Sequence, residues 1–195
     1  HLTHNPMLYK NMGKRISDII LASLAFILLS PLLIFVAVLI KTFDPGPIVF
    51  SQNRVGRFGH HFNFYKFRSM PVNTKNLPSD QIGQVGLTWV GKLIRRTSID
   101  ELPQLMNIIK GEMSLVGPRP PLPSQLELVE YRRQSGALNV YPGLTGLAQV
   151  NSFDGMSDKQ KAEFDALYVA KITMTADLII MFKTILYFFK KPPIY

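Results

Sequence analysis

The longest apolar run in the chain extends from Ile19 to Ile40, 22 residues that include no charged side chain. A helix of about 20 apolar residues is long enough to cross the hydrocarbon core of a bilayer. Ser30 and Pro31 lie at the centre of the run, and a proline inside a helix removes a backbone donor and produces a kink. Because basic residues stand on both sides, the positive-inside rule indicates no direction. The pattern therefore leaves two structures open, a kinked span and a helix-break-helix hairpin that enters and leaves on one face.

The rest of the chain consists of short periodic segments separated by glycines and prolines. Alternation in residues 46–70 predicts two short strands around a turn near Arg57 to Gly59. Residues 114–125 contain four prolines and are expected to be irregular. Helical periodicity predicts helices over residues 87–96, 100–111, 125–137, 158–172 and 176–189, with Gly111 as a C-terminal cap of the second. The last of these is too short to span a bilayer, and its apolar face fits a membrane interface and core packing equally well.

Composition adds charge to this picture. Lys and Arg total 22 and Asp and Glu total 13, which gives a formal net charge of +9. Such an excess favours polyanionic partners, namely nucleic acid, anionic lipid or phosphorylated substrates. Cysteine is absent, which excludes a disulfide framework and a thiolate zinc site. Hydrophobic residues make up 47% of the chain, a high share for a basic soluble domain.

Asp100 and Glu101 are adjacent acids in this basic chain, within the segment "SIDELPQL". A purely structural interpretation exists, because Ser98 and Glu101 have the spacing of a helix capping box. Pro103 indicates that the helix starts later than a cap at Ser98 would place it. With Asp100 as the cap, the proline falls at the third helical position, where no amide donor is required. We therefore expect a helix that begins at Asp100 and places this carboxylate where helix amides point outward.

Five basic residues are candidates for binding phosphate near these acids. Arg119 lies in "GPRPP", where flanking prolines limit its backbone freedom and leave it less ordering entropy to lose. The others are Arg95, Arg96, Lys66 and Arg68, and a solvated strand face is the alternative for the last two. An ionised aspartate can attack phosphorus without a base if arginines and a divalent cation held by the neighbouring carboxylate offset the repulsion between anions. Acids at this place count against nucleic-acid binding.

Three stretches follow the Ser-Pro-interrupted run in order: "YKFRSM", "RRTSIDELPQLMNIIKGEMSLVGPRP" and "YPGLTGLAQVN". Together they resemble the bacterial monotopic phosphoglycosyl transferases, in the minimal, PglC-like form of bacterial sugar transferase. The resemblance implies an α-rich α+β, membrane-associated fold. Residues 1–43 would hold a re-entrant helix-break-helix membrane hairpin bent at Ser30 and Pro31. Residues 44–195 would form a small cytoplasmic-face catalytic domain of short amphipathic, interfacial helices and a short β-hairpin.

The resemblance also implies an activity. The enzyme would move a phosphosugar from a UDP-sugar to undecaprenyl phosphate and release UMP, as the first membrane step of glycoconjugate biosynthesis. Asp100 would be the nucleophile of a phosphosugar-aspartyl intermediate, and Glu101 would assist it, with Mg²⁺ held by these two acids. Substrate phosphate would be bound by Arg119, Lys66, Arg68, Arg95 and Arg96. The loop residues expected to line the site are Pro142, Gly143, Thr145 and Gly146.

The same resemblance places the protein on the cytoplasmic face of the bacterial inner membrane. The partners it implies are the UDP-sugar, undecaprenyl phosphate and the lipid bilayer, with a second copy of the chain or downstream glycosyltransferases as further candidates. No nucleic acid is expected.

One departure from the family pattern limits what is carried over. Ser152 and Phe153 stand where relatives usually have Gly-Arg, so an arginine expected at phosphate or sugar is missing and no relative's sugar is assigned. Two alternatives stay open. Transfer of the bare sugar would release UDP instead of UMP. A non-catalytic basic membrane-bound scaffold for glycan-pathway enzymes would keep its function when Asp100 is replaced by Asn.

Overall fold

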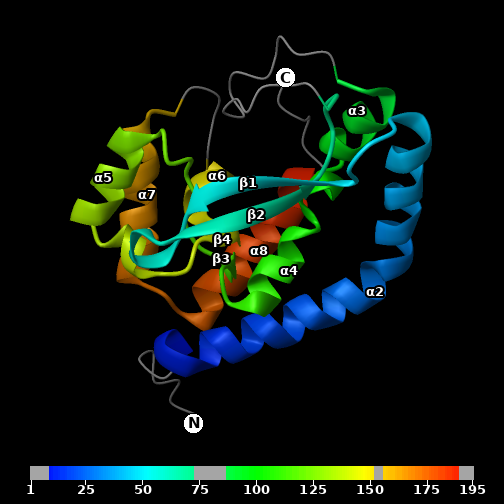
Figure 1. The fold of residues 1–195 in the computed structure, drawn as a ribbon. Helices are drawn as coiled ribbons and strands as arrows, with labels where there is room; N and C mark the ends of the chain where they lie inside the picture. The colour runs from blue at the N-terminus through cyan, green and yellow to red at the C-terminus, as the bar shows by residue number, and fades with distance from the viewer. Residues whose placement is uncertain (1–8, 73–86, 152–155, 189–195) are drawn as a thin grey trace.

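The computed structural model describes residues 9–72, 87–151 and 156–188. Its elements in chain order are η1 (Tyr9–Gly13), α2 (Lys14–Phe43), β1 (Val49–Val55), η2 (Arg57–Gly59), β2 (His61–Phe67), α3 (Trp89–Arg96), η4 (Ile99–Glu101), α4 (Gln104–Lys110), β3 (Ser114–Val116), α5 (Leu126–Gln134), η5 (Ala137–Asn139), β4 (Gly143–Thr145), α6 (Leu147–Asn151), α7 (Asp158–Ala170) and α8 (Met174–Phe188). Helix α2 runs along one edge of the molecule and turns up beside α3, while α5 and α7 lie together at the opposite edge (Figure 1). The helix-rich fold with little strand agrees with the sequence-based expectation.

Helix α2 is one continuous helix that is bent in its middle (Figure 1). Pro31 lies inside it and has no amide hydrogen to donate to the carbonyl of Ile27, four residues earlier. The Ser30 hydroxyl donates to that same carbonyl at 2.8 Å and so restores part of its hydrogen bonding. The expected break is therefore a bend within a single helix, because Ser30 supplies the donor that Pro31 lacks.

The length and composition of α2 allow it to cross a membrane. Its most apolar 18-residue window has a mean hydropathy of 2.8, and only 17% of that window is buried in the protein. A core helix of a soluble protein would be mostly covered. Exposure is greatest next to the bend, where the side chain of Leu28 is 80% exposed. Both ends, in contrast, pack on the protein: Ala22 lies against α4 and β2, and Ile40 against α3.

The two small sheets have different topologies. Strands β1 and β2 form the expected antiparallel hairpin, with Val49 opposite Phe67 and Val55 opposite His61. Strands β3 and β4 pair in parallel. The prediction that residues 114–125 are irregular is therefore wrong for residues 114–116, which form β3. The prolines begin only after this strand, and its partner β4 lies far along the chain. A short helix, α6, was likewise not expected.

The helix expected to begin at Asp100 begins instead at Gln104, with Pro103 as its N-cap residue. Asp100 lies in the separate 3₁₀ turn η4. The reason is Ser98, whose φ of 53° is left-handed and reverses the chain directly after α3. Gly111 ends α4 with a φ of 91°, which confirms its predicted role as the cap.

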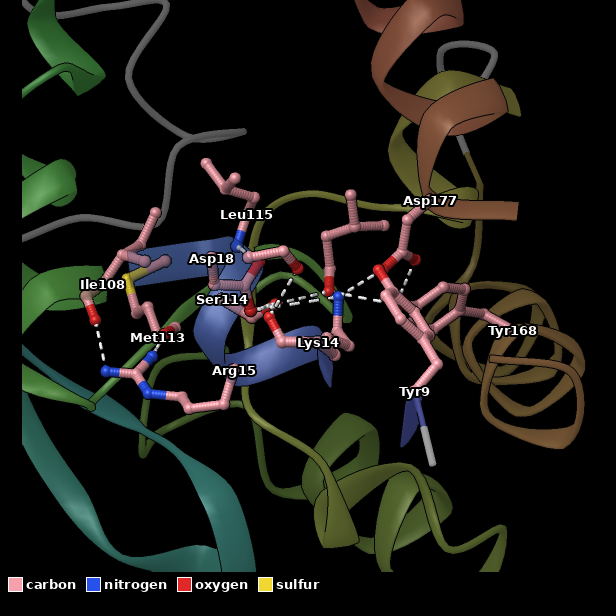
Figure 2. Close-up of polar contacts among 12 residues, drawn as sticks. Tyr9, Lys14, Arg15, Asp18, Ile108, Met113, Ser114, Leu115, Tyr168 and Asp177 are labelled. Carbon is pink, nitrogen blue, oxygen red and sulfur yellow. Dashed lines mark hydrogen bonds and ion pairs between the residues drawn. The ribbon is translucent and has the colours of Figure 1, made fainter. Parts of the chain in front are cut away.

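A cluster of buried polar side chains attaches the start of α2 to the rest of the protein (Figure 2). We call it the anchor cluster; its members are Tyr9, Lys14, Asp18, Ser114, Tyr168 and Asp177. One oxygen of Asp177 accepts bonds from Lys14 at 2.6 Å and Tyr9 at 2.7 Å. The other accepts from Tyr168 at 2.7 Å. Asp18 accepts from the Ser114 hydroxyl at 2.7 Å and the Leu115 amide at 3.2 Å. Each buried carboxylate is thus compensated, and the cluster joins α2 to β3, α7 and α8.

Arg15 adds a second attachment at the end of α4. Its guanidinium donates to the carbonyls of Ile108 at 2.6 Å and Met113 at 3.0 Å, as Figure 2 shows. Carbonyls in the last turn of a helix have no partner within the helix, so a cation stabilises this end. The start of the apolar helix is therefore fixed on the segment that follows the two acids.

Candidate active site

Glu101 lies at the centre of a charged group drawn from three segments. Lys66, in β2, donates to Oε1 at 2.7 Å. Arg119 donates to Oε2 at 3.2 Å and makes a second, short bond to Oε1. Burial alone would raise the pKa of the Glu101 carboxyl, but Arg119 and Lys66 outweigh it and hold that pKa well below its usual range. Glu101 is therefore an ionised partner of two cations.

Asp100 lies beside this group in a different state. Its side chain is buried, at 5% exposure, and no residue in the described part of the chain donates a hydrogen bond to its carboxylate. Burial raises its pKa to about 6; Lys66 acts in the opposite direction, and Glu101 raises it further. At neutral pH the carboxylate is mostly ionised and uncompensated by hydrogen bonds. A perturbed acid of this kind beside several cations is typical of a nucleophile.

The local backbone explains which of the two neighbouring arginines reaches Asp100. Ser98 turns the chain back on α3, so the half-buried Arg95 in the last turn of that helix lies close enough to lower the pKa of Asp100. Arg96 is one helical position further and is exposed. Adjacent helical residues point about 100° apart. Arg95 therefore acts electrostatically on Asp100, and phosphate binding by the exposed Arg96 stays a prediction.

Arg68 is not part of this group. Its guanidinium bonds the backbone carbonyl of Asp44, just after α2, and pairs with the Asp44 carboxylate at 3.4 Å. Its Nε and Nη1 are buried and have no partner within the described residues. Lys66, two residues earlier, faces Glu101 instead. Phosphate binding by Arg68 stays a prediction.

The loop predicted to line the site is buried. Gly143 and Gly146 lie directly against the backbone of Gly117, and a Cβ on either would come within 2.1 Å of it. Thr145 shares a 2.7 Å hydrogen bond with the hydroxyl of Thr184. Pro142 is buried as well. These residues support the segment that carries Arg119, and their contact with substrate stays a prediction.

Two polar residues near the acids were missed by sequence reasoning. Arg54, in β1, is buried, and its pKa is lowered to about 10 by burial and by the charge of Arg119. Gln104 is fully buried one turn after Asp100, and both of its amide atoms lack a partner in the described part of the chain. The only signal available for either was a polar residue within an apolar pattern. Residues 152–153, where the family pattern is broken, lie outside the described residues.

The donor set fits a magnesium ion that is held partly by substrate. Mg²⁺ is usually bound by one or two carboxylates together with substrate phosphates and water. Within the described ranges, Asp100 offers oxygens that accept no hydrogen bond, and Oε2 of Glu101 accepts a bond from Arg119 at 3.2 Å. Among the residues that the structure describes, no three or more His, Cys, Asp or Glu side chains are grouped as a metal cage. The two acids therefore suit an ion shared with a diphosphate.

Comparison with known proteins places this site in a family. A family model described as bacterial sugar transferase matches residues 9–191. The chain belongs to the bacterial sugar transferase family. The match includes both acids and the cations around them, and it confirms the resemblance seen in the sequence motifs.

Two of the relatives are named as sugar-phosphate transferases. The chain is 41% identical over 181 residues to the UDP-glucose:undecaprenyl-phosphate glucose-1-phosphate transferase of Klebsiella pneumoniae. It is 42% identical over 182 residues to the UDP-N-acetylgalactosamine-undecaprenyl-phosphate N-acetylgalactosaminephosphotransferase of Aeromonas hydrophila. Each match covers 88% of this chain but only 39% and 42% of those relatives. The exopolysaccharide production protein ExoY of Sinorhizobium fredii is 39% identical over 195 residues, 89% of this chain and 84% of ExoY.

Proposed function

We propose that this protein transfers a phosphosugar from a UDP-sugar to undecaprenyl phosphate and releases UMP, through a covalent intermediate on Asp100. The observation that carries the proposal is the buried Asp100 carboxylate, without hydrogen bonds from the described residues, next to the group of Glu101, Lys66 and Arg119. The names of the relatives support the donor and acceptor classes. The sugar itself is left open.

The first half of the reaction forms a bond between a carboxylate oxygen of Asp100 and the phosphorus that carries the sugar. The bond from that phosphorus to the bridging oxygen breaks, and the electron pair leaves with UMP. An anion attacking an anion requires positive charge nearby. Arg119, Lys66 and Arg95 supply it, and Glu101 keeps two of these cations in place.

In the second half, an oxygen of undecaprenyl phosphate attacks the same phosphorus and the bond to Asp100 breaks. The carboxylate is regenerated and the product is a diphosphate-linked sugar on lipid. The site retains the intermediate because Asp100 is buried and water has limited access to it. When bound, magnesium would add charge neutralisation for the diphosphate, with Glu101 and Asp100 as its protein ligands.

The attachment of α2 supports a re-entrant, monotopic topology. Lys14 and Asp18 bind its first turns to the catalytic part, and Ile40 packs its last turns on α3 of the same part. A straight span would carry these ends to opposite sides of a bilayer. With the bend at Pro31 placed in the membrane, both ends lie at one face, which we propose to be the cytoplasmic face of the inner membrane.

The activity is tested with purified protein, magnesium, undecaprenyl phosphate and a panel of UDP-sugars. UMP release that requires Asp100 is expected, and without acceptor a burst of one UMP per protein should accompany a mass increase of one sugar phosphate. Asp100→Asn should lose both signals. Glu127→Gln, an exposed acid on α5, is the matched control. Release of UDP would support bare sugar transfer, and neither product with any donor would support the scaffold alternative.

The topology is tested by cysteine labelling, which the absence of native cysteine makes clean. Met12→Cys and Phe43→Cys, both well exposed, should react only from the cytoplasmic face, and Leu28→Cys should be protected by lipid. Pro31→Ala should favour a straight helix and move one end to the outer face. Labelling of Met12→Cys from the outer face in the otherwise unchanged protein would rule out the hairpin.

A further inference from the structure

Arg119 is carried by a loop in which its three neighbours have no backbone donor. Residues 118–121, the proline loop, contain three prolines without amide hydrogens. Each of its four carbonyls nevertheless accepts a bond from elsewhere. The carbonyl of Pro118 accepts from the Gly143 amide at 2.9 Å, and that of Pro121 accepts from the Val55 amide at 3.0 Å. The loop is thus held between β4 and β1.

The two central carbonyls are bound by buried arginine side chains. Arg132 Nη1 donates to the carbonyl of Arg119 at 2.6 Å, and Arg54 Nη1 donates to that of Pro120 at 3.1 Å. These arginines are 2% and 7% exposed. A buried guanidinium requires compensation, so its bond to one chosen carbonyl is a specific feature of the fold.

Arg132 is itself held by Asp165. Nε of Arg132 donates to Oδ2 of Asp165 at 2.8 Å, and Nη2 lies 2.6 Å from the same oxygen. The pair joins α5 to α7, which lie side by side at the edge of the molecule opposite α3 (Figure 1). Two of the guanidinium nitrogens are thereby oriented, and the third, Nη1, points to the loop that carries Arg119.

We propose that Arg132 and Asp165, together with Arg54, are positioning residues that set the place of the Arg119 guanidinium at Glu101. This inference rests on the proposed function. The chain of contacts runs from Asp165 to Arg132, to the Arg119 carbonyl, and through the Arg119 side chain to Glu101. A displacement of about 1 Å in such a constellation can reduce the rate about a hundredfold.

Replacing both members of the buried pair separates positioning from stability. Removing one member would leave an unpaired buried charge, whereas replacing both by apolar residues is often neutral for folding. Arg132→Met combined with Asp165→Leu should therefore fold, with a melting temperature close to that of the unchanged protein. We expect its kcat/KM for the UDP-sugar, measured by UMP release, to fall roughly 10- to 100-fold because the Arg119 carbonyl loses its donor.

A double-mutant cycle with Arg119→Ala identifies the route of the effect. If Arg132 and Asp165 act through Arg119, adding the apolar pair to Arg119→Ala should reduce activity less than about threefold further. Multiplied losses would overturn the proposal, as would full activity of a folded Arg132→Met/Asp165→Leu variant. If that variant does not fold, Arg54→Met, which removes the donor to the Pro120 carbonyl, takes its place in the cycle with Arg119→Ala. Losses that multiply, or full activity of a folded Arg54→Met variant, would then overturn the proposal.

The matched control is the exposed ion pair on the same helix. Arg133 and Glu130 lie 2.6 Å apart, with side chains 63% and 49% exposed. Arg133→Met combined with Glu130→Leu makes the same chemical change on α5 without touching the proline loop, and its activity should match that of the unchanged protein. Absence of UMP release in the unchanged protein would refute the proposed function, whereas the cycle judges the positioning role in an active enzyme.

Discussion

The anchor cluster and the active-site group are both sets of buried and half-buried acids and bases, but the buried acids at their centres differ in how many hydrogen bonds they accept. In the anchor cluster, both oxygens of Asp177 and of Asp18 accept bonds from the protein. In the active-site group, Glu101 is bonded by two cations, while Asp100 accepts no hydrogen bond from the described residues. Asp177 and Asp100 are thus almost equally buried, at 4% and 5% exposure, but they differ in hydrogen bonding and therefore in chemistry.

The difference separates stability from reactivity. A carboxylate whose two oxygens both accept hydrogen bonds is stabilised by its donors and holds elements together. Burial raises the pKa of Tyr168 and Asp177 raises it further, so Tyr168 remains a donor. A buried carboxylate that accepts no hydrogen bonds opposes folding, and its lone pairs stay available to an incoming phosphorus or metal. Ser98, with its left-handed φ, is next but one to Asp100, and Phe58 in the turn between β1 and β2 also has a positive φ.

The largest expected effect is on turnover. Asp100→Asn keeps the shape of the side chain but removes its nucleophilic oxygen, so UMP release should fall by about 1,000-fold or more while the protein stays folded. Single-turnover UMP release and circular dichroism measure the two properties. Substantial burst formation by the folded variant would show that Asp100 is not the nucleophile.

The next effect is on stability. Asp177→Asn removes the charge that pairs with Lys14 inside the protein, and we expect a loss of about 3 kcal/mol in the free energy of unfolding. Denaturant unfolding in detergent micelles measures it, and molecules that remain folded should release UMP at an ordinary rate. Asp158→Asn, in a half-exposed pair with Lys161, is the control and should change stability by less than about 1 kcal/mol. Equal losses in the two variants would argue against a stabilising anchor.

A smaller effect links Asp100 to pH. Its pKa is raised by burial from 3.8 to about 6, so the folded state binds the proton more tightly than the unfolded state does. The cost of the buried carboxylate is therefore absent below pH 4 and complete above pH 7. Without magnesium, Asp100→Asn should be more stable than the unchanged protein at pH 7.5, by roughly 2 to 3 kcal/mol, with less advantage at pH 4.5. An advantage independent of pH would contradict the raised pKa.

The smallest effect concerns the strained backbone before Asp100. Glycine adopts a φ near 53° without the Cβ clash that Ser98 has, so Ser98→Gly should raise the free energy of unfolding by about 0.5 kcal/mol. Thermal unfolding measures the gain. Ser98→Val, whose branched side chain fits this region poorly, is the opposite control and should destabilise. A gain from valine would mean that the conformation is not strained.

Much of the fold follows from local patterns in the sequence. The alternation before and after Gly59 predicted the β1–β2 hairpin, and the left-handed Gly111 ends α4 as expected. The apolar run with Ser30 and Pro31 predicted a kink or a break, and α2 is one helix that is bent in its middle. These features depend on neighbours a few residues apart, so periodicity, a cap or a proline is enough to predict them.

The adjacency of Asp100 and Glu101 and the proline-flanked Arg119 were also visible in the sequence. They indicated charged chemistry and, through the family motifs, its class. Only the tertiary structure separated the two acids into a Glu101 paired with two cations and an Asp100 that accepts no hydrogen bond from the residues that the structure describes. It also divided the basic candidates, placing Lys66 and Arg119 on Glu101 and Arg68 on Asp44.

The contacts between distant segments decided the rest. Arg132 reaches the Arg119 carbonyl from α5, and Asp177 reaches Lys14 across more than 160 residues. No local pattern specifies such a pair, because a buried charge is stabilised by whichever group the packed chain brings to it. The sequence by itself determined which segments are helical, which are apolar and which residues can carry the chemistry. The packing of those segments determined the ionisation, the hydrogen bonding and the position of each charged side chain.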